Sequence, residues 1–269
     1  MKILRAALAL FIVAWAGNSL ASDIDLSHWK LTLPVSKNSE AGKAREILNP
    51  GGFSMSPYFV PHADGITFSA SVGGALTPRT RYPRTELREM SGKAKYSWRV
   101  AKGGTLSATL RVDAVPQLEK ISAGALPAAV PLQAPGPGRI VVGQIEGPRD
   151  ELCRLYYDRG VLYFNDDKSG AEQTQKSFAL KDTSGKMTNI PLGKTFSYTI
   201  DANATQLTVS AVVDGQTYTA SEPIGPFWPK KPLYFKAGAY IQVNTPASKS
   251  LETGTGTGTV TFSSIVVRH

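Results

Sequence analysis

The stretch from Leu233 to Val243, LYFKAGAYIQV, alternates strictly between two kinds of residue. Successive side chains of a β-strand point to opposite faces, so the apolar side chains of this stretch would share one face. The other face would carry two phenols, an amine and an amide around a glycine. A glycine within a strand commonly marks a place where a ligand or another backbone approaches closely. We therefore predict a half-buried strand with a functional polar face. That face comprises Tyr234, Lys236, Gly238, Tyr240 and Gln242.

The chain around this stretch reads as many short strands separated by Gly, Pro, Asn and Asp. Residues 158–160 (Asp-Arg-Gly) and 214–215 (Asp-Gly) are hairpin-type turn signals between alternating runs. Such punctuation predicts an all-β sandwich or barrel with mostly antiparallel sheets. We expect one short helix over residues 39–48 (SEAGKAREIL), and two long loops over residues 116–138 and 244–259.

A second stretch with a distinctive face is RTRYPRTELR, residues 79–88. In a strand, Arg84, Glu86 and Arg88 would share one face, with Leu87 on the other. Arginine is rarely buried without a partner, and its planar guanidinium matches the shape of a carboxylate. The pattern suggests a clamp for carboxylates, although a salt-bridge network on a solvated sheet would use the same residues.

A third stretch, VGQIEG at residues 142–147, places Gln144 and Glu146 on one face of a strand that continues from two apolar residues. The pair suggests the polar floor of a cleft, and an edge strand facing water is the alternative. Together, the three polar faces would line the concave side of a sheet with arginines, an amide, tyrosines and a lysine. Such a groove would bind a chain of carboxylates, with aromatic rings available to sugars.

The composition favours an anionic partner and gives no support to several other chemistries. The formal net charge is +9, and a basic protein attracts polyanions. The three histidines, His28, His62 and His269, do not have metal-ligand spacing, and neither a GxSxG nor a P-loop pattern occurs, so we expect no metal and no cofactor. Glu86 and Glu146 keep glycoside hydrolysis open as an alternative, because that reaction uses two carboxyl groups.

The first 21 residues have the pattern of a secretory signal peptide. Lys2 and Arg5 form a basic start, residues 3–16 are almost wholly apolar, and residues 19–21 (SLA) supply small residues at the cleavage position. The alternative is a membrane anchor, but the apolar run is short for a span. We therefore expect residues 1–21 to be removed during export.

The remaining residues, 22–269, are expected to form one domain in the periplasm or outside the cell. Export argues against nucleic acid as a partner, and we expect a monomer with no membrane partner. A single cysteine, Cys153, cannot form an internal disulfide. Because it lies between apolar neighbours, we predict a buried, unreactive thiol.

At the three polar stretches the sequence resembles the alginate lyases of polysaccharide lyase family 7. That family is marked by an R-[ST]-E-L-R motif, a Q-I-H or Q-V-H motif and a Y-F-K-A-G-x-Y-x-Q motif. Here they correspond to residues 84–88 (RTELR), 144–146 (QIE) and 234–242 (YFKAGAYIQ), and residues 26–34 and the strand ending at His269 also fit. The resemblance implies a β-jelly roll of two antiparallel sheets with a substrate groove on the concave sheet. It also implies β-elimination, in which a uronate loses its C5 proton and the C4-linked sugar oxygen leaves.

The resemblance also implies roles for individual residues. Arg84 and Gln144 would neutralise the uronate carboxylate and stabilise the negative charge that builds as the proton leaves. Tyr240 would protonate the leaving oxygen and, for some substrates, take the C5 proton, with nearby cations stabilising its tyrosinate form. Glu146 completes the candidate catalytic set. The residues expected to hold the substrate are Glu86, Arg88, Tyr234, Lys236 and Gln242.

Glu146 departs from the family pattern, because the second motif normally ends in histidine. In the family, that histidine helps to neutralise the uronate and is the expected base for guluronate, whose C5 proton lies anti to the leaving oxygen. A first interpretation pairs Glu146 with Arg84 or Arg88. Tyr240 then serves as both base and acid, which favours substrates with a syn proton: polymannuronate first, with glucuronan as its rival.

The glutamate at this position also fits two alternatives. In one, Glu146 is itself the base or is held protonated; in the other, the pocket accepts a different uronan. A function of a different class is that of a polyuronate-binding protein that has lost its chemistry, although the retained Tyr240 counts against it.

Overall fold

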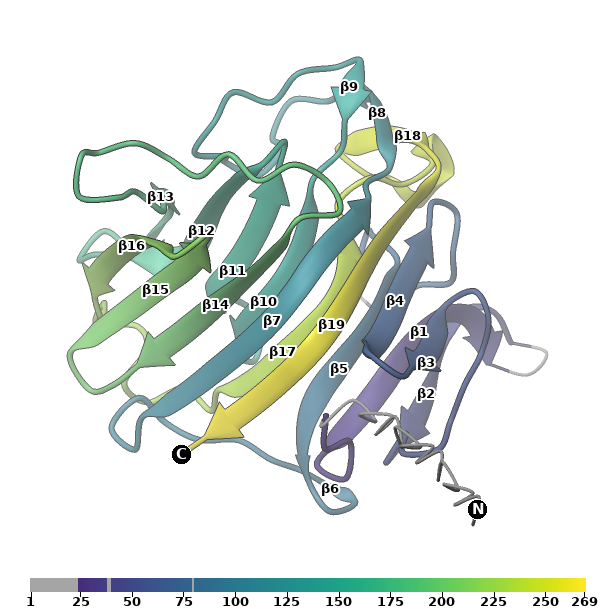
Figure 1. Cartoon of the computed structure of the whole chain (residues 1–269), viewed down its shortest axis with the longest axis horizontal. Coiled ribbons are helices and arrows are strands. Elements are labelled where there is room, and N and C mark those ends of the chain that lie inside the picture. Colours follow the sequence, from purple (N-terminus) through teal and green to yellow (C-terminus); the bar gives the residue numbers. More distant parts are fainter. Residues whose placement is uncertain (1–23, 38–39, 79) are drawn as a thin grey trace, which may run out of the picture.

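The computed structural model describes residues 24–37, 40–78 and 80–269. The predicted signal peptide, residues 1–21, lies outside the described residues. Two antiparallel sheets pack face to face and account for most of the described chain (Figure 1). This confirms the predicted all-β jelly roll of two antiparallel sheets.

The larger sheet carries the three polar stretches, and we call it the groove sheet. Its strands follow one another in the order β13 (Thr174–Ala179), β12 (Val161–Ser169), β11 (Glu151–Asp158), β10 (Ile140–Glu146), β17 (Tyr234–Ile241), β5 (Arg84–Ser91), β1 (Trp29–Lys37) and β2 (Glu40–Leu48), and β6 (Ala94–Lys95) pairs with β5. The three polar stretches therefore lie on the adjacent strands β10, β17 and β5.

The second sheet, which we call the outer sheet, covers the other side of the core. Its order is β16 (Gln216–Pro223), β15 (Gln206–Val213), β14 (Thr195–Ala202), β7 (Gly104–Ala114), β19 (Thr257–Arg268), β4 (Gly65–Ser71) and β3 (Phe59–His62). Its long strand β7 alternates between buried and half-buried residues over most of its length, as expected for a strand with one face in the core.

The core between the sheets explains the alternation read from the sequence. On β17, the side chains of Phe235, Ala237, Ala239 and Ile241 are fully buried and belong to the main apolar cluster. Burial of apolar surface is the dominant favourable term in folding. A one-residue slip in register would exchange this apolar face for the polar one, so the core fixes which side chains face the groove.

The helix predicted over residues 39–48 is wrong, because residues 40–48 form the edge strand β2. β2 pairs with β1, with Leu48 opposite Lys30 and Arg45 opposite Leu33. The local sequence suits a helix, but the pairing supplies hydrogen bonds to the open edge of β1, and tertiary context commonly overrides weak propensity. Residue 39 lies outside the described residues.

Both segments predicted as loops contain short strands that pair with one another. Strands β18 (Glu252–Thr255), β8 (Gln117–Ile121) and β9 (Gly136–Pro137) form a small third sheet in that order. This sheet lies at one end of the sandwich, at the top of Figure 1. A 3₁₀ helix, η1 (Pro246–Ser248), precedes β18. The two segments, far apart in sequence, are therefore joined.

The predicted turns and the predicted buried cysteine are confirmed. Residues 158–160 connect β11 to β12, and residues 214–215 connect β15 to β16. In the first turn, Arg159 and Gly160 have φ angles of 50° and 84°, the left-handed conformation that such tight hairpins use. Cys153 on β11 is fully buried in the core.

Candidate active site

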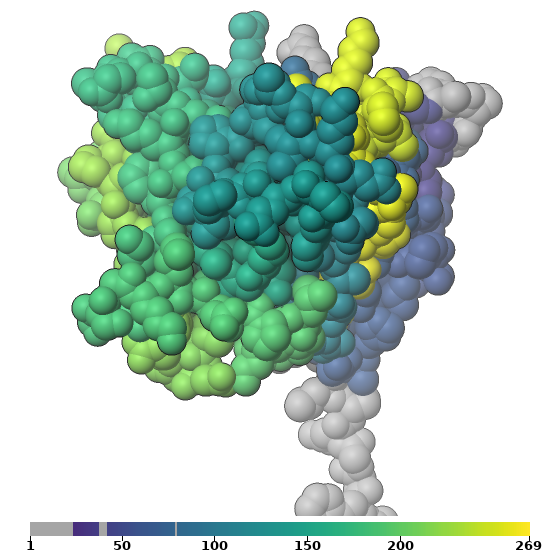
Figure 2. Space-filling model, turned by 90° about the horizontal axis from the view of Figure 1, so that it is seen from above, coloured from purple at the N-terminus to yellow at the C-terminus, as the bar shows by residue number. Residues whose placement is uncertain are grey.

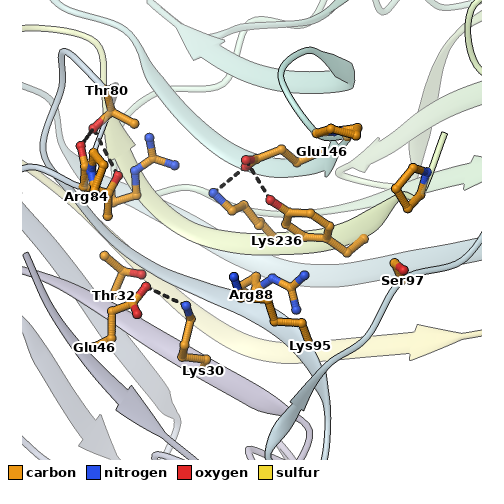
Figure 3. Close-up of a pocket in the computed structure, with 16 residues that line it drawn as sticks. Lys30, Thr32, Glu46, Thr80, Arg84, Arg88, Lys95, Ser97, Glu146 and Lys236 are labelled. Atoms are coloured by element: carbon orange, nitrogen blue, oxygen red, sulfur yellow. Dashed lines mark hydrogen bonds and ion pairs between the residues drawn. The ribbon is translucent and has the colours of Figure 1, made fainter.

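A groove of about 530 Å³ crosses the groove sheet from β2 to β10 (Figure 3). Because it runs across the strands, each strand contributes side chains from its outward face. Each of the three polar stretches contributes side chains to this groove, but the predicted catalytic residues Gln144 and Tyr240 are not among the residues that line it. The side chains that line it from the strands are Lys30, Thr32, Glu46, Arg84, Arg88, Lys95, Glu146, Tyr234 and Lys236.

Glu86 on β5 is the centre of the polar floor, although it is only 2% exposed. Its Oε2 lies 3.1 Å from Arg84 Nη1 and 3.1 Å from Lys236 Nζ. Gln144 Nε2 donates a hydrogen bond to Glu86 Oε1. A buried carboxylate is costly unless it is paired, and these three donors supply the pairing. Glu86 therefore positions an arginine, a lysine and an amide, and its own carboxylate does not face the groove.

Gly238 on β17 makes this arrangement possible. It lies directly opposite Glu86, and a Cβ atom there would be 2.4 Å from the carbonyl oxygen of Thr85. Two backbones thus approach closely at the glycine, as predicted from the sequence. The hydrogen bond from Gln144 on β10 to Glu86 on β5 spans β17, and an added Cβ at position 238 would press on the Cα and Cβ atoms of Glu86.

Glu146 at the end of β10 is held by two side chains of β17. Its Oε2 lies 2.5 Å from Lys236 Nζ, and the Tyr234 hydroxyl donates a hydrogen bond of 2.7 Å to its Oε1 (Figure 3). Burial would raise the pKa of Glu146, but the positive charges of Lys236 and Arg84 outweigh burial and lower the pKa to about 2. Glu146 is therefore ionised, and its ion-pair partner is Lys236, where the sequence suggested Arg84 or Arg88.

The two carboxylates do not suit glycoside hydrolysis. That reaction needs one carboxyl group that is protonated near neutral pH, which requires a raised pKa. Glu146 has a lowered pKa, and Glu86 shares Lys236 with it. Burial opposes the charge on Lys236, but Glu146 and Glu86 together raise the pKa of the amine. Glu146 therefore cannot act as the acid, and Glu86 is buried among Arg84, Lys236 and Gln144.

Arg84 and Tyr240 form a second pair beside this set. The guanidinium carbon of Arg84 lies 3.7 Å from the centre of the Tyr240 ring, which is a cation–π contact. Burial would lower the pKa of Arg84, but Tyr240, Glu86 and Glu146 raise it. Arg84 Nε and Gln144 Oε1 find no hydrogen-bond partner among the described residues. Arg84 thus keeps a buried donor that an anion would satisfy.

The remaining predicted substrate-binding residues, Arg88 and Gln242, occupy different positions relative to the groove. Arg88 lines the groove, with its guanidinium carbon 3.9 Å from the centre of the Tyr234 ring. Gln242 is only 1% exposed, and its amide donates to the carbonyl oxygen of Ile241 at 3.2 Å. Gln242 therefore does not line the groove, and its role in substrate binding stays a prediction.

Arg154 on β11 adjoins the candidate site through its neighbour Gln144, and sequence reasoning did not identify it. It lies opposite Gln144 and is 7% exposed. Its guanidinium pairs with Glu151 and lies 3.4 Å from Asp167. The alternation of RLYY at residues 154–157 places Arg154 on the same strand face as Tyr156. This shared polar face was the sequence pattern that could have identified Arg154. Nothing local in the sequence indicates that this strand would pair with β10.

Comparisons with known proteins agree with this geometry. The sequence matches the Alginate_lyase2 family, described as alginate lyase, over residues 24–269. An alginate lyase of Klebsiella pneumoniae is 32% identical over 271 residues, covering 82% of this chain and 83% of that protein. The crystal structure of the alginate lyase from Klebsiella pneumoniae superposes with a TM-score of 0.73 at 28% identity, covering 91% of this chain and 96% of that chain. An alginate lyase structure from Pseudomonas aeruginosa gives a TM-score of 0.68 at 30% identity, covering 91% and 99%.

Proposed function

Because the chain belongs to the alginate lyase family and is therefore a polysaccharide lyase, we propose that it cleaves alginate and prefers its polymannuronate blocks. The reaction is a β-elimination that leaves an unsaturated uronate at the new non-reducing end. The observation that carries the preference is Glu146, which is ionised and held by Lys236 and Tyr234.

Arg84 and Gln144 are assigned to the substrate carboxylate. Removing the C5 proton builds a second negative charge beside that carboxylate, so preorganised donors lower the barrier. Arg84 Nε has no hydrogen-bond partner in the described part of the chain, and Glu86 holds both side chains in place through its two carboxylate oxygens. Arg84 Nε is therefore a donor already in place when the charge develops, whereas Gln144 Nε2 donates to Glu86 and would have to use its second N–H.

Tyr240 is assigned to both proton transfers. As a tyrosinate it takes the C5 proton, and the electron pair of the C5–H bond forms the C4–C5 double bond while the C4–O bond breaks. The phenol then returns the proton to the leaving sugar oxygen. The guanidinium of Arg84 lies over the ring of Tyr240 and places a positive charge beside it.

One residue can perform both transfers only when the C5 proton and the C4 oxygen lie on the same side of the sugar. Mannuronate meets that condition, and guluronate does not. For guluronate a second base would be needed on the opposite side, where the family motif has histidine. In this chain Glu146 occupies that motif position. It is a poor base, because its pKa is about 2 and its two oxygens contact Lys236 and Tyr234.

A panel of pure polymannuronate, polyguluronate and glucuronan tests the preference, with absorbance of the unsaturated ends as the readout. We expect the wild type to be fastest on polymannuronate and at least about tenfold slower on polyguluronate. The variant Glu146→His should gain activity on polyguluronate. Rapid cleavage of polyguluronate alone would overturn the preference, preferential cleavage of glucuronan would reassign the substrate, and binding without absorbance would favour a binding protein.

We further propose that the protein is exported and acts as a monomer on an anionic polysaccharide. Export is supported by the basic start, the apolar run and the small residues at positions 19–21. In the described part of the chain, no helix has the length and apolar character required to cross a membrane. N-terminal sequencing of protein from cell fractions should find a chain beginning near residue 22, and light scattering should give the mass of one chain.

A further inference from the structure

Beyond Glu146 the groove continues as a second depression of about 540 Å³. The residues that line both hollows are Pro78, Thr80, Glu146 and Pro148. A polymer that lies in the groove therefore has room to continue into the depression. Arg149 and Glu151 line only the depression. Its charged groups are thus one arginine and two glutamates, and two ionised glutamates there would repel an anionic polymer.

Glu151 is the first residue of β11 and lies directly opposite Glu146 on β10. Like charges directly opposite each other on neighbouring strands destabilise a sheet. Glu146 is held in its ionised form, because its two oxygens contact Lys236 and Tyr234. The repulsion therefore acts on Glu151, whose side chain is only 18% exposed.

A second carboxylate shares the cation of Glu151. The guanidinium of Arg154 pairs with Glu151 and also lies 3.4 Å from Asp167 Oδ2. Asp167 accepts hydrogen bonds from the backbone N–H of Glu151 at 3.0 Å and from Gln175 Nε2 at 2.6 Å. Burial would raise the pKa of Asp167, but the hydrogen bonds from Glu151 and the charge of Arg154 lower it. Asp167 therefore holds the negative charge of this pair of carboxyl groups.

The ion pairs at this end of the groove contain more carboxyl groups than cations. Their carboxyl groups are Glu86, Glu146, Glu151 and Asp167, and their cations are Arg84, Lys236 and Arg154. One carboxyl group in this part of the described chain thus has no charge to balance it, and Glu151 is that group. Burial raises the pKa of Glu151 to about 8, although the charge of Arg154 opposes the rise. The nearby carboxyl groups of Asp167 and Glu146 add to it.

The turn before β11 carries two more charged residues close to Glu151 in the chain. Arg149 is exposed to solvent, and Asp150 pairs with Lys168 on β12 at 3.6 Å. An exposed charge is screened by water and salt, and the second pair is balanced within itself. Neither supplies a charge that would keep Glu151 ionised in its partly buried position.

A balanced pair at the end of the molecule shows the contrast. Figure 2 looks down on that end, where teal atoms of the chain around β8 and β9 lie beside yellow atoms of the chain around β18. Arg139 there pairs with Glu252 of β18 at 2.6 Å. Within the described residues, Arg139 thus meets one carboxyl group and Arg154 meets two. Only the second arrangement has a carboxyl group in excess.

We propose that Glu151 is a neutral, protonated wall of the depression, and that its ionisation in alkaline solution weakens the binding of the anionic polymer. This inference rests on the proposed function, because it takes a polyuronate as the occupant of the groove. While Glu151 shares a proton with Asp167, Arg154 balances the one negative charge of the pair. Loss of that proton leaves one positive charge against two negative ones, beside the carboxylates of the substrate. The repulsion acts on binding, since the proton transfers are assigned to Tyr240.

Binding measured across the pH range tests the inference. The variant Tyr240→Phe leaves the ligand intact, so calorimetry can follow the Kd of a mannuronate oligomer long enough to occupy both the groove and the depression. The Kd should be steady between about pH 6 and 7 and rise about fivefold by about pH 9.5, the effect of two like charges about 4 Å apart in water. The KM of the wild type should rise over the same range.

The outcomes separate this inference from the proposed function. A Kd and a KM that do not change with pH would overturn the inference while leaving the lyase activity in place. Absence of unsaturated ends from the wild type at every pH would instead count against the proposed function, whether or not the oligomer binds.

Two substitutions should remove the pH dependence in different ways. Glu151→Gln keeps the shape of the side chain but cannot ionise, and Asp167→Asn leaves Arg154 with one carboxylate to balance. In both variants the Kd and the KM at pH 9.5 should stay within about twofold of their values at pH 7. The control Asp214→Asn, an exposed carboxylate in a turn of the outer sheet, should keep the full rise. A fivefold rise that persists in Glu151→Gln would overturn the assignment.

Discussion

Two buried arginines, Arg84 on β5 and Arg139 just before β10, are used differently. Arg139 donates to both oxygens of Glu252, to the Tyr163 hydroxyl at 2.8 Å and to two backbone carbonyls. Within the described chain, Arg84 donates to Glu86, stacks on a tyrosine ring and leaves Nε without a hydrogen-bond partner. A buried polar group without a partner costs stability, so the protein tolerates at Arg84 a cost that it avoids at Arg139.

This difference separates structural from functional use of the same side chain. A fully bonded guanidinium joins elements of the fold and has no donor left for a ligand. An incompletely bonded one is held ready for an anion that the protein itself does not supply. Substitutions at the two arginines and at their partners test that distinction.

The tyrosine partners of the two arginines provide a matched pair of substitutions. Tyr240→Phe removes the hydroxyl assigned to both proton transfers, and we expect kcat to fall by about 10³-fold, within the range for loss of general acid–base catalysis. Tyr163→Phe should leave kcat unchanged and cost about 1 kcal/mol of stability, the usual worth of one hydrogen bond. Initial rates and urea unfolding measure the two effects. Full activity in Tyr240→Phe would refute the mechanism.

Removing Arg139 should mainly affect stability. Arg139→Met leaves Glu252 buried and unpaired, and breaking a buried ion pair in this way costs about 3–5 kcal/mol. Urea unfolding monitored by tryptophan fluorescence checks the loss. The double variant Arg139→Met, Glu252→Leu serves as the control and should recover part of it, because no unpaired charge remains. A single variant as stable as the wild type would contradict the structural role.

Arg84→Lys should show the opposite behaviour. Lysine keeps the positive charge but lacks the planar fork that can hold a carboxylate while contacting Glu86, so we expect kcat to fall by about 10²-fold. The free energy of unfolding should change by less than about 1 kcal/mol, since only one hydrogen bond depends on the fork. A loss of stability as large as that of Arg139→Met would remove the distinction between the two arginines.

Glu146 should make a smaller contribution that depends on pH. Its pKa of about 2 lies below the usual value of 4.5, so its ion pair stabilises the folded state above about pH 4.5 and loses this effect as the pH falls toward 2. Glu146→Gln should therefore cost on the order of 2 kcal/mol at pH 7 and little near pH 2. Unfolding curves across this pH range provide the measurement, and a pH-independent difference would contradict the assignment.

The features that could be predicted from the sequence are those that depend on the local alternation of residues. Alternation identified β17 and the face of each polar stretch, and Gly238 correctly marked a close approach of backbones. The sequence pattern did not predict which distant segments pair with one another. It did not show that residues 40–48 would add an edge strand, that Glu146 would pair with Lys236, or that Arg139 would reach Glu252. Those contacts depend on which strands become neighbours, and no local period encodes that.

The position of β19 in the outer sheet has a consequence for how the chain is made. β19 lies between β4 and β7, with Val260 opposite Phe68 on one side and opposite Val112 on the other. Until residues 257–268 have left the ribosome, β4 and β7 each lack a neighbour, and the core side of the outer sheet stays incomplete. The outer sheet can therefore close only after β19, the last strand along the described chain, has been made, and such long-range pairing forms slowly.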